Sequence, residues 1–499
     1  MDSSSVCFFP GSSGVYSAGR VVNTQPSIVA YQHAYLVGAI AGRSLRARAK
    51  AREQLTHSAT LLFGGNACFF GLEHGMFASD EVATVFTGNT GGTGSWSSSE
   101  GSLEFTREPA PVSSLAIKKH VMCLMSDTGG GHRASAQALK DGFEIMFGDS
   151  FAIHVVDLWS SSSPWPLCNM PKSYFFLVKN PWLWRLSFRC SEPEILHEAL
   201  FTGYTALVGR RFAKAFHENE PSLIVSVHPL MQHVPLKVLA RMKAESSFVA
   251  ARVPFTTVVT DLTRCHRTWF HRHVDKCFVA TQLVAAQAMS YGLVANQLAC
   301  HGLPIRPAFN AESLPKVELR RLLQLDLTAS TVMLVGGGEG MGKLEATAEA
   351  LSQTLSPGHQ IVVICGRNEK LARTLAARTW PLKMVIKGFV NNMSEYMSAC
   401  DCIITKAGPG TIAEALICGL PILLNGFIPC QEEGNVSFVL ENGVGAFSED
   451  PVEISQIISR WFKSDGIELN SMSSKAKSLG RPEATFNIVR DLAGMSTTY

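Results

Sequence analysis

The sequence lacks several patterns by which common classes of protein are recognised. Its 13 cysteines are scattered and form no Cys-x-x-Cys pair, so neither a disulfide framework nor a zinc site is expected, and a reducing compartment is favoured. No apolar run reaches the roughly 18 residues that a membrane-spanning helix needs. Lys and Arg number 44 against 41 Asp and Glu, a balance that gives no support to nucleic-acid binding.

Acidic residues are nearly absent from the first 70 residues, which contain only Asp2 and Glu53. The same segment contains six basic residues, namely Arg20, Arg43, Arg46, Arg48, Lys50 and Arg52. This composition is typical of an organelle transit peptide, and the alternative is a tail without a targeting role. Because a Gly/Ser/Thr-rich tract follows at 87–102, we predict that residues 1–112 are a transit peptide and a flexible linker.

The rest of the chain alternates short apolar runs with helical periodicity, which predicts parallel sheets covered by helices. The runs of a first sheet lie at 119–125, 152–156, 223–227, 256–259 and 276–279. After a Pro-rich hinge at 302–307, those of a second sheet lie at 331–335, 360–364, 384–386, 402–405 and 421–424. We therefore predict an α/β protein with two Rossmann-like domains facing a cleft, residues 113–305 and 306–499, the second ending in C-terminal helices.

The first glycine loop, Gly129-Gly130-Gly131-His132, joins a predicted strand to a predicted helix. Its backbone N–H groups and the positive helix end suit an anion. The same helix end disfavours a charged imidazole, so His132 is expected to be neutral near pH 7 and able to accept a proton as a general base. The alternative is a histidine that caps the helix or contacts phosphate.

Three further elements in the second half suit a nucleotide sugar. The loop 336–342, with Gly337 and Gly338, follows a strand but does not match the phosphate-binding loop of ATPases, and a tight turn is its alternative. Backbone amides of Ala407-Gly408-Pro409-Gly410-Thr411 suit a diphosphate, and Glu414, on the same helix face as Thr411, suits ribose hydroxyls. The polar cluster Gln431-Glu432-Glu433-Gly434-Asn435 suits sugar hydroxyls if a helix puts Gln431 and Asn435 on one face; alone, such a cluster is more often a solvated helix start.

The chain contains no Asp-x-Asp triplet, the pair with which many sugar transferases hold a metal ion on a diphosphate. We therefore expect no metal in the site, with helix ends and one cation neutralising the diphosphate instead. Arg306, which lies among the prolines of the hinge, is the candidate cation, and the alternative is an ordinary surface arginine.

An aromatic tract in the first half combines tryptophans with basic residues, and its tryptophans are Trp159, Trp165, Trp182 and Trp184. Such a mixture favours the headgroup level of a membrane, and the alternative is a core segment. The basic run 264–273, which includes Trp269, is a candidate second lipid-facing patch.

Taken together, these motifs resemble those of the plant monogalactosyldiacylglycerol synthases, from about Val121 to about Leu492. The resemblance is carried by four long motifs, at 126–133, 228–235, 336–342 and 403–411. More distantly, the second half is similar to the bacterial peptidoglycan N-acetylglucosaminyltransferase. The family resemblance implies a type B glycosyltransferase fold and an inverting transfer of galactose from UDP-galactose to diacylglycerol, without a cofactor. It also implies a peripheral protein of the plastid envelope that is stimulated by anionic lipids such as phosphatidic acid and phosphatidylglycerol.

The resemblance also assigns roles by position. His132 matches the proposed base, and Pro166 and Trp269 match positions linked to anionic lipid and acceptor. The positions that match UDP-sugar contacts are Arg306, Gly388, Phe389, Val390, 407–411 and 431–435. The sequence departs from the family at Ser160–Ser163, where charged or bulkier residues are expected, which bears on acceptor and activator preference. The long N-terminus resembles the inner-envelope type.

Two rival functions stay open on the sequence alone. One is a glucosyl- or N-acetylglucosaminyltransferase of the same fold, since no residue separates galactose from glucose on physical grounds. The other is a lipid-regulated nucleotide-sugar binding protein, against which His132 argues. The sequence leaves open the acyl-chain preference, the leader cleavage site, the preferred anionic lipid and the formation of an oligomer.

Overall fold

The computed structural model describes residues 118–245, 253–337, 343–463 and 466–496, all within one compact unit. The predicted transit peptide and linker, residues 1–112, and Gly338 of the second glycine loop lie outside the described residues. Within the described ranges, no helix has the length and apolar character that crossing a bilayer requires.

The first sheet has six parallel strands in the order β2-β1-β3-β4-β5-β6. Its strands are β1 (Lys119–Leu124), β2 (Phe151–Val156), β3 (Leu223–Ser226), β4 (Phe255–Val258), β5 (Lys276–Val279) and β6 (Leu298–Cys300). The helices that accompany it are α3 (Gly130–Phe147), α4 (Leu158–Ser162), α5 (Met170–Val178), α6 (Pro181–Ser191), α7 (Glu194–Asn219), α8 (His233–Ala244) and α9 (Gln282–Ser290).

The second sheet also has six parallel strands, in the order β12-β11-β10-β7-β8-β9. Its strands are β7 (Ser330–Val335), β8 (His359–Ile364), β9 (Lys383–Lys387), β10 (Cys402–Thr405), β11 (Ile422–Leu424) and β12 (Gly445–Phe447). The helices that follow in the chain are α10 (Lys316–Leu322), α11 (Leu344–Thr354), α12 (Glu369–Ala376), α13 (Met393–Ala399), α14 (Pro409–Cys418), α15 (Glu433–Glu441), α16 (Pro451–Lys463), α17 (Ile467–Leu479) and α18 (Ala484–Met495).

Both faces of each sheet are buried, as continuous apolar strands require. In β1, Met122 and Leu124 pack into a core with α7 and α8, while Val121 and Cys123 pack into another with α3 and α18. Side chains alternate between faces along a strand, so one short apolar run serves two cores. The second sheet is built in the same way, with Met333 and Val332 of β7 in different cores.

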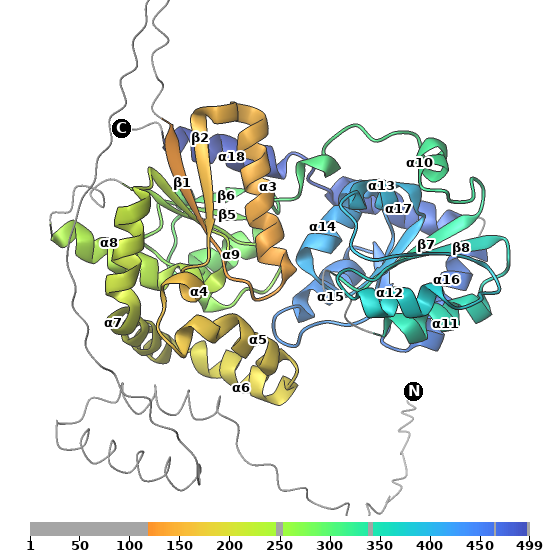
Figure 1. Ribbon diagram of the computed structural model, residues 1–499, viewed down its shortest axis with the longest axis horizontal. Coiled ribbons are helices and arrows are strands. Elements are labelled where there is room, and N and C mark those ends of the chain that lie inside the picture. Colours follow the sequence, from red (N-terminus) through yellow and green to blue (C-terminus); the bar gives the residue numbers. More distant parts are fainter. Residues whose placement is uncertain (1–117, 246–252, 338–342, 464–465, 497–499) are drawn as a thin grey trace, which may run out of the picture. The chain divides into compact units, whose positions relative to one another are not determined.

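The last helix, α18, returns to the first sheet. Ile488 and Val489 lie in the core formed with α3, and Figure 1 shows α18 beside α3. Gly142 of α3 makes this approach close, because a Cβ there would lie 3.0 Å from Thr485 Cγ2. Thr485 also accepts a hydrogen bond from the backbone N–H of Ile305, at 2.8 Å. The end of the chain thus packs with the first half of the protein.

The predicted fold of two Rossmann-like halves is confirmed, and the structure adds one strand to each sheet. Strands β6 and β12 are three residues long, and their residues are half-buried or exposed. They lie at sheet edges, where no long apolar run is needed, so the sequence pattern did not indicate them.

Candidate active site

The candidate base, His132, stands at the start of α3, directly after the glycine loop that follows β1. Gly129 has a φ of 130°, a conformation that a side chain would strain, so glycine permits this abrupt turn. The Nδ1 atom of His132 lies 2.9 Å from the carbonyl oxygen of Val227 and 3.1 Å from Thr260 Oγ1. Because a carbonyl only accepts hydrogen bonds, Nδ1 carries the proton and Nε2 has a free lone pair.

Burial keeps this imidazole neutral. Desolvation lowers the pKa of His132 to about 4, against a smaller opposing effect of the hydrogen bond to Val227. No carboxylate contributes to this shift, so nothing compensates the charge of an imidazolium. At neutral pH His132 therefore has the protonation state and the tautomer that a general base needs.

Two aromatic side chains surround His132: His228 follows β3, which pairs with β1, and Trp269 lies in the segment between β4 and β5. The His228 ring lies 4.5 Å from the His132 ring and the Trp269 ring 5.9 Å from it. Nδ1 of His228 accepts from the N–H of Leu230, so its Nε2 donates to Thr128 Oγ1, at 2.8 Å. Strands β1, β3 and β4 are neighbours, so their following loops meet at the carboxyl edge, where parallel sheets bind ligands.

The structure corrects the aromatic part of the predicted lipid-facing patch at 264–273. Trp269 and Phe270 are buried, whereas Arg264 and Arg272 are exposed. The indole N–H of Trp269 donates to Oδ2 of Asp261, at 2.8 Å. A short 3-10 turn, Arg267–Trp269, directs the aromatic side chains inward, so composition alone misled the prediction. Trp269 thus faces the candidate base and does not reach the membrane surface.

Asp261 is a site residue that the sequence analysis missed. It is buried beside Trp269, directly after Thr260, which contacts His132. Burial raises the pKa of Asp261 to about 7, partly opposed by the hydrogen bond from Trp269. The only signal in the sequence was an acidic residue just after a buried strand.

In the second half, the structure pairs two residues that were predicted to act separately. Arg306 Nη2 lies 2.7 Å from Glu414 Oε1, and Glu414 is largely buried. Burial raises the pKa of Glu414, and the charge and hydrogen bond of Arg306 oppose this rise. Glu414 therefore compensates part of the charge of Arg306. The Glu414 carboxylate, which was predicted to bind ribose hydroxyls, already accepts hydrogen bonds from Arg306.

Lys406 is a second cation that the sequence analysis did not single out. It follows β10, and its side chain lies near the two glycine loops, 3.9 Å from a Cβ built at Gly337 and 3.4 Å from one built at Gly408. It forms an ion pair with Glu432, whose other oxygen accepts the N–H of Ile428, at 2.9 Å. β7 and β10 are adjacent strands, so both loops open at one edge of the sheet.

The start of α14 keeps only part of the predicted diphosphate contact, because the N–H groups of Ala407 and Gly408 already donate to the carbonyls of Gly426 and Lys406. Gly408 is the N-cap residue, Pro409 occupies the first turn, and no side-chain hydrogen bond caps this end. The next amides, of Gly410 and Thr411, belong to the first turn of a helix, whose N–H groups have no partner within the helix. Gly419, with a φ of 69°, ends the same helix in the left-handed conformation.

The polar cluster 431–435 differs from its predicted geometry. Helix α15 begins at Glu433, so Gln431 lies before it and does not share a helical face with Asn435. Gln431 accepts from the hydroxyl of Tyr174, at 3.2 Å. Asn435 is buried, donates to the carbonyl of Ala407 at 2.9 Å and accepts from Thr263 Oγ1 at 3.3 Å. Asn435 thus joins the loop that carries Thr263 to the loop after β10.

Two further residues of this cluster, Glu433 and Gly434, have different environments. Glu433 is exposed. A Cβ at Gly434 would lie only 2.2 Å from Thr263 Oγ1, so glycine is required by this close approach.

The turn Gly388-Phe389-Val390 follows β9, and exposed Phe389 stacks under the guanidinium of Arg367, at 5.7 Å from the ring centre.

The aromatic tract divides into three environments. Trp159 is fully buried and donates to the carbonyl of Leu230, so the alternative of a core segment holds for it. Trp184 is half-buried and donates to the carbonyl of Pro429, at 2.7 Å, which ties α6 to the loop before Gln431. Trp165 and Trp182 are 75% and 66% exposed. Half-buried Pro166 follows Trp165.

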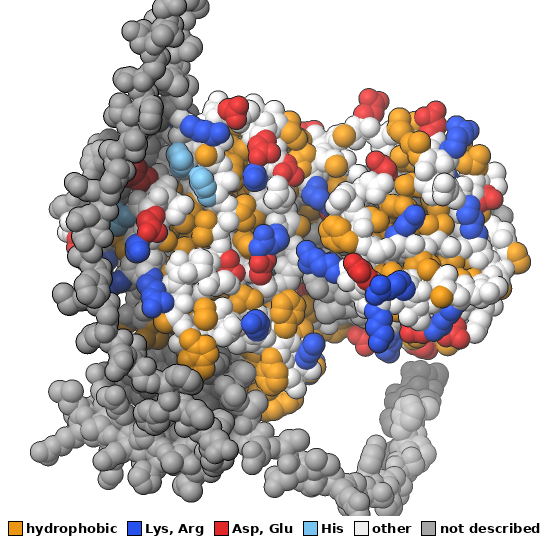
Figure 2. Space-filling model, viewed as in Figure 1, with side chains coloured by type: hydrophobic (Ala, Val, Ile, Leu, Met, Phe, Trp, Pro, Cys, Tyr) orange, Lys and Arg blue, Asp and Glu red, His pale blue; other side chains and the backbone are white. Residues whose placement is uncertain are grey.

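Exposed basic residues accompany the exposed tryptophans on α5 and α6, and include Lys172, Lys179, Arg185 and Arg189. Figure 2 shows hydrophobic and basic side chains together over these two helices. This surface has the composition expected at the headgroup level of a membrane.

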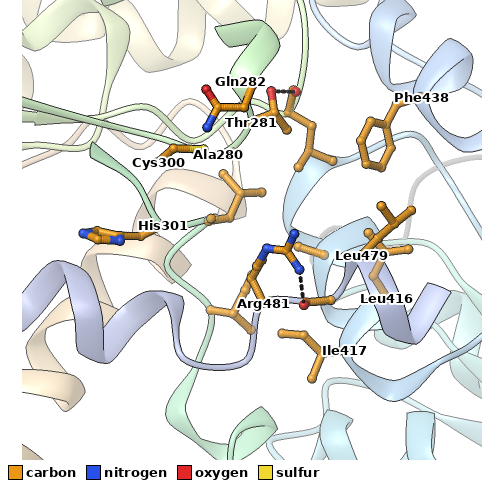
Figure 3. A pocket seen from close by; sticks show the side chains of 16 residues that line it. Ala280, Thr281, Gln282, Cys300, His301, Leu416, Ile417, Phe438, Leu479 and Arg481 are labelled. Atoms are coloured by element: carbon orange, nitrogen blue, oxygen red, sulfur yellow. Dashed lines mark hydrogen bonds between the residues drawn. The ribbon is translucent and has the colours of Figure 1, made fainter. Parts of the chain in front are cut away.

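A cavity of about 360 Å³ is separate from His132 and the glycine loops. It is lined by residues from both halves, among them Thr281, His301, Leu416 and Arg481 (Figure 3). The Arg481 guanidinium donates to the backbone carbonyl of Gly480, at 3.1 Å. Because the lining contains neither His132 nor the glycine loops, we do not assign the reaction to this cavity.

The fold and the site together define a class of protein. Two parallel six-stranded sheets carry a neutral histidine at one carboxyl edge and glycine loops with a cation at the other. Residues 331–436 match the family model described as glycosyltransferase family 28 C-terminal domain. The protein is therefore a glycosyltransferase built from two Rossmann-like domains.

Relatives define the family. Residues 132–305 match the model described as monogalactosyldiacylglycerol (MGDG) synthase. The chain is 45% identical to monogalactosyldiacylglycerol synthase 1, chloroplastic, of Arabidopsis thaliana, over 83% of this chain and 80% of that protein. It is 47% identical to the chloroplastic enzyme of Spinacia oleracea, over 79% and 75% of the two chains. The chain belongs to the monogalactosyldiacylglycerol synthase family.

Among solved structures, MurG of Acinetobacter baumannii is similar at 14% identity and a TM-score of 0.48, over 75% of this chain and 99% of that one. This distant likeness carries no argument about function.

Proposed function

We propose that this chain transfers galactose from UDP-galactose to the primary hydroxyl of 1,2-diacylglycerol with inversion, and that His132 is the general base. The observation that carries the mechanism is the fixed tautomer of a neutral His132, with Nε2 free to accept a proton. The names of the relatives support the lipid product.

The reaction is a single displacement. Nε2 of His132 takes the proton from the acceptor hydroxyl, and the oxygen attacks the anomeric carbon from the face opposite UDP. The bond from that carbon to the diphosphate oxygen breaks, so an α-linked donor gives a β-galactoside. The first turn of α14 stabilises the charge that develops on the departing diphosphate, and Lys406 and Arg306, whose charges Glu432 and Glu414 partly compensate, add hydrogen-bond donors there.

The reaction takes place at a membrane surface, because the acceptor is a bilayer lipid. The exposed Trp165 and Trp182, with the basic residues of α5 and α6, support peripheral attachment and stimulation by anionic lipids. The relatives named as chloroplastic and the basic, acid-poor N-terminus support a chloroplast location, and the resemblance of the long N-terminus to the inner-envelope type supports the inner envelope.

A product assay tests this function. Purified protein is incubated with mixed micelles of diacylglycerol and phosphatidylglycerol and with UDP-galactose, UDP-glucose or UDP-N-acetylglucosamine in separate reactions. We expect a β-linked galactolipid from UDP-galactose alone, resolved by chromatography and NMR. A glucolipid or an N-acetylglucosaminyl lipid as main product would contradict the donor assignment, and an α-linked product would contradict inversion.

A further inference from the structure

Three histidines from separate elements meet outside the active site described above. His197 is in the first turns of α7, His233 begins α8, and His271 follows the turn that carries Trp269. The rings of His197 and His233 lie 4.2 Å apart, and those of His233 and His271 lie 4.9 Å apart. Figure 1 shows α7 and α8 side by side, and the two helices pack closely.

Three buried imidazole nitrogens of His197 and His233 lack hydrogen-bond partners among the described residues, whereas Nδ1 of His271 accepts from the N–H of His273. His197 and His233 are 1% and 3% exposed. Within the described part of the chain, neither nitrogen of His233 nor Nε2 of His197 has a partner. A neutral imidazole carries at least one N–H, so His233 buries a donor with no acceptor, which native interiors rarely tolerate.

A carboxylate completes the set. One ligand atom from each of His197, Glu198 and His233 can be chosen so that all lie within 4.8 Å of one another. Zinc bonds of about 2.0–2.2 Å place tetrahedral ligands roughly 3.5 Å apart, so a small movement of the side chains is enough to bring these atoms to an ion. Glu198 is exposed and accepts from Lys237 Nζ through Oε2, at 2.7 Å, which leaves its other oxygen for an ion.

We propose that His197, Glu198 and His233 bind a divalent transition-metal ion of the Zn²⁺ class. Imidazole and carboxylate suit this ion, and three protein ligands leave a fourth position open. The two histidines lie on different helices and far apart in the sequence, so the spacing rules that argued against a zinc site could not indicate them.

The ion would position an active-site wall. His271 stands two residues after Trp269, whose ring lies 5.9 Å from that of His132. The His271 ring packs against that of His233, so an ion that orders His233 also supports the end of the segment that carries Trp269. The site thus stabilises the first half of the protein and takes no part in proton transfer or in diphosphate binding.

Metal titration of the full chain tests the proposal without depending on activity. The purified protein is stripped with a chelator and titrated with Co²⁺, whose visible absorption separates a tetrahedral site from adventitious surface binding. We expect one saturable site per chain, from which Zn²⁺ displaces Co²⁺. His197→Gln and His233→Gln should each weaken binding by more than the roughly 10–100-fold that loss of an outer-shell partner costs.

A matched control lies on the same helix. His217 is exposed in the last turn of α7, so His217→Gln should leave the affinity unchanged. If the ligand variants do not fold, the wild-type Co²⁺ spectrum and a rise in thermal midpoint with added Zn²⁺ decide the question. The proposal is overturned if stripped wild-type protein gives no tetrahedral spectrum and no stabilisation, or if the ligand variants bind as tightly as His217→Gln.

Discussion

At the residue scale, the chemistry depends on how the protein holds one imidazole. A backbone carbonyl, that of Val227, orients His132, and no carboxylate balances a positive charge on the ring. A carbonyl fixes the tautomer without raising the pKa as much as an ion pair would. His132 is therefore neutral and able to accept a proton over the whole physiological pH range. Because its pKa is low, the imidazolium that forms in the reaction loses its proton readily.

The pH profile of His132 follows from its lowered pKa. The folded pKa of about 4 lies below the usual 6.5, so the neutral base persists as pH falls through 6.5 and is lost only near 4. We expect the acid limb of kcat/KM near pH 4, measured within the range where the protein stays folded. His132→Ala should lower kcat by roughly 10²–10⁴-fold with little change in UDP affinity. A variant with near-normal turnover would assign the base elsewhere.

Asp261 should make stability depend on pH in the opposite sense to an ordinary aspartate. Its folded pKa of about 7 lies above the usual 3.8, so the folded state binds the extra proton between these values. Stability therefore falls as pH rises from about 4 to about 7 and then levels off. Asp261→Asn keeps an acceptor for Trp269 and removes the charge, so it should be more stable than wild type near pH 8 by up to a few kcal/mol.

Urea unfolding near pH 5 and pH 8 measures this difference. Asp261→Ala is the control, because it leaves the indole N–H of Trp269 without its acceptor and should destabilise at both pH values. Equal pH dependence in wild type and Asp261→Asn would show that Asp261 is ionised throughout this range.

At the scale of elements, function lies at the carboxyl ends of neighbouring strands. β1, β3 and β4 bring His132, His228 and Thr260 together, while β7 and β10 bring their loops to Lys406. Parallel strands end at one edge, so short loops suffice to assemble each set. Helices α5 and α6 add the exposed aromatic and basic surface.

The diphosphate should bind without a divalent ion, because α14 and Lys406 offer positive charge where an Asp-x-Asp pair is missing. Initial rates in EDTA should match those in Mg²⁺, measured within minutes of addition. Immediate loss in EDTA that Mg²⁺ or Mn²⁺ restores would contradict this account. A slow loss that only Zn²⁺ reverses would instead concern the histidine cluster.

Membrane binding should depend on Trp182 and not on its neighbour Trp184. Trp182 is exposed, whereas Trp184 donates to the carbonyl of Pro429. Trp182→Ala should therefore weaken flotation with phosphatidylglycerol vesicles and leave UDP binding intact. Trp184→Ala, the matched variant, should alter UDP-galactose binding through the loop before Gln431.

Binding of the wild-type protein to these vesicles should also fall as salt rises, since exposed charges are screened. Equal flotation of all proteins at all salt concentrations would contradict a role of this surface in membrane binding.

At the scale of the whole molecule, contacts between distant segments complete the site. Thr263 of the first half hydrogen-bonds Asn435 of the second, and the Tyr174 hydroxyl reaches Gln431. Helix α18 returns from the end of the chain to pack on α3, whose first turn carries His132. The position of the base therefore depends on both ends of the described chain.

Gly434 should tolerate no side chain, because a Cβ would lie 2.2 Å from Thr263 Oγ1 and 3.0 Å from its Cβ. We expect Gly434→Ala to destabilise by about 1–3 kcal/mol through overpacking and to lower kcat/KM. Adding Thr263→Ala removes the nearest atom and should restore part of both losses. Thermal melting and initial rates on the four proteins of this cycle measure the coupling; strictly additive losses would show that the two residues are not in contact.

The prediction of the fold succeeded because its signals are local. Each buried parallel strand, such as β7, is a continuous apolar run, and each glycine loop follows such a run directly. The family motifs are local in the same sense. Short edge strands such as β6 left no such run, and burial of Trp269 depends on a turn that composition does not specify.

The sequence by itself determined the two Rossmann-like halves, the family and the position of His132 in a glycine loop. Only the tertiary structure decided which partners these residues have: Val227 for His132, Glu414 for Arg306, Trp269 for Asp261, and three histidines for one another. The physical reason is that strand and loop patterns arise from neighbours in the chain. Burial, pKa and hydrogen-bond partners instead arise from segments that meet only when the chain is folded.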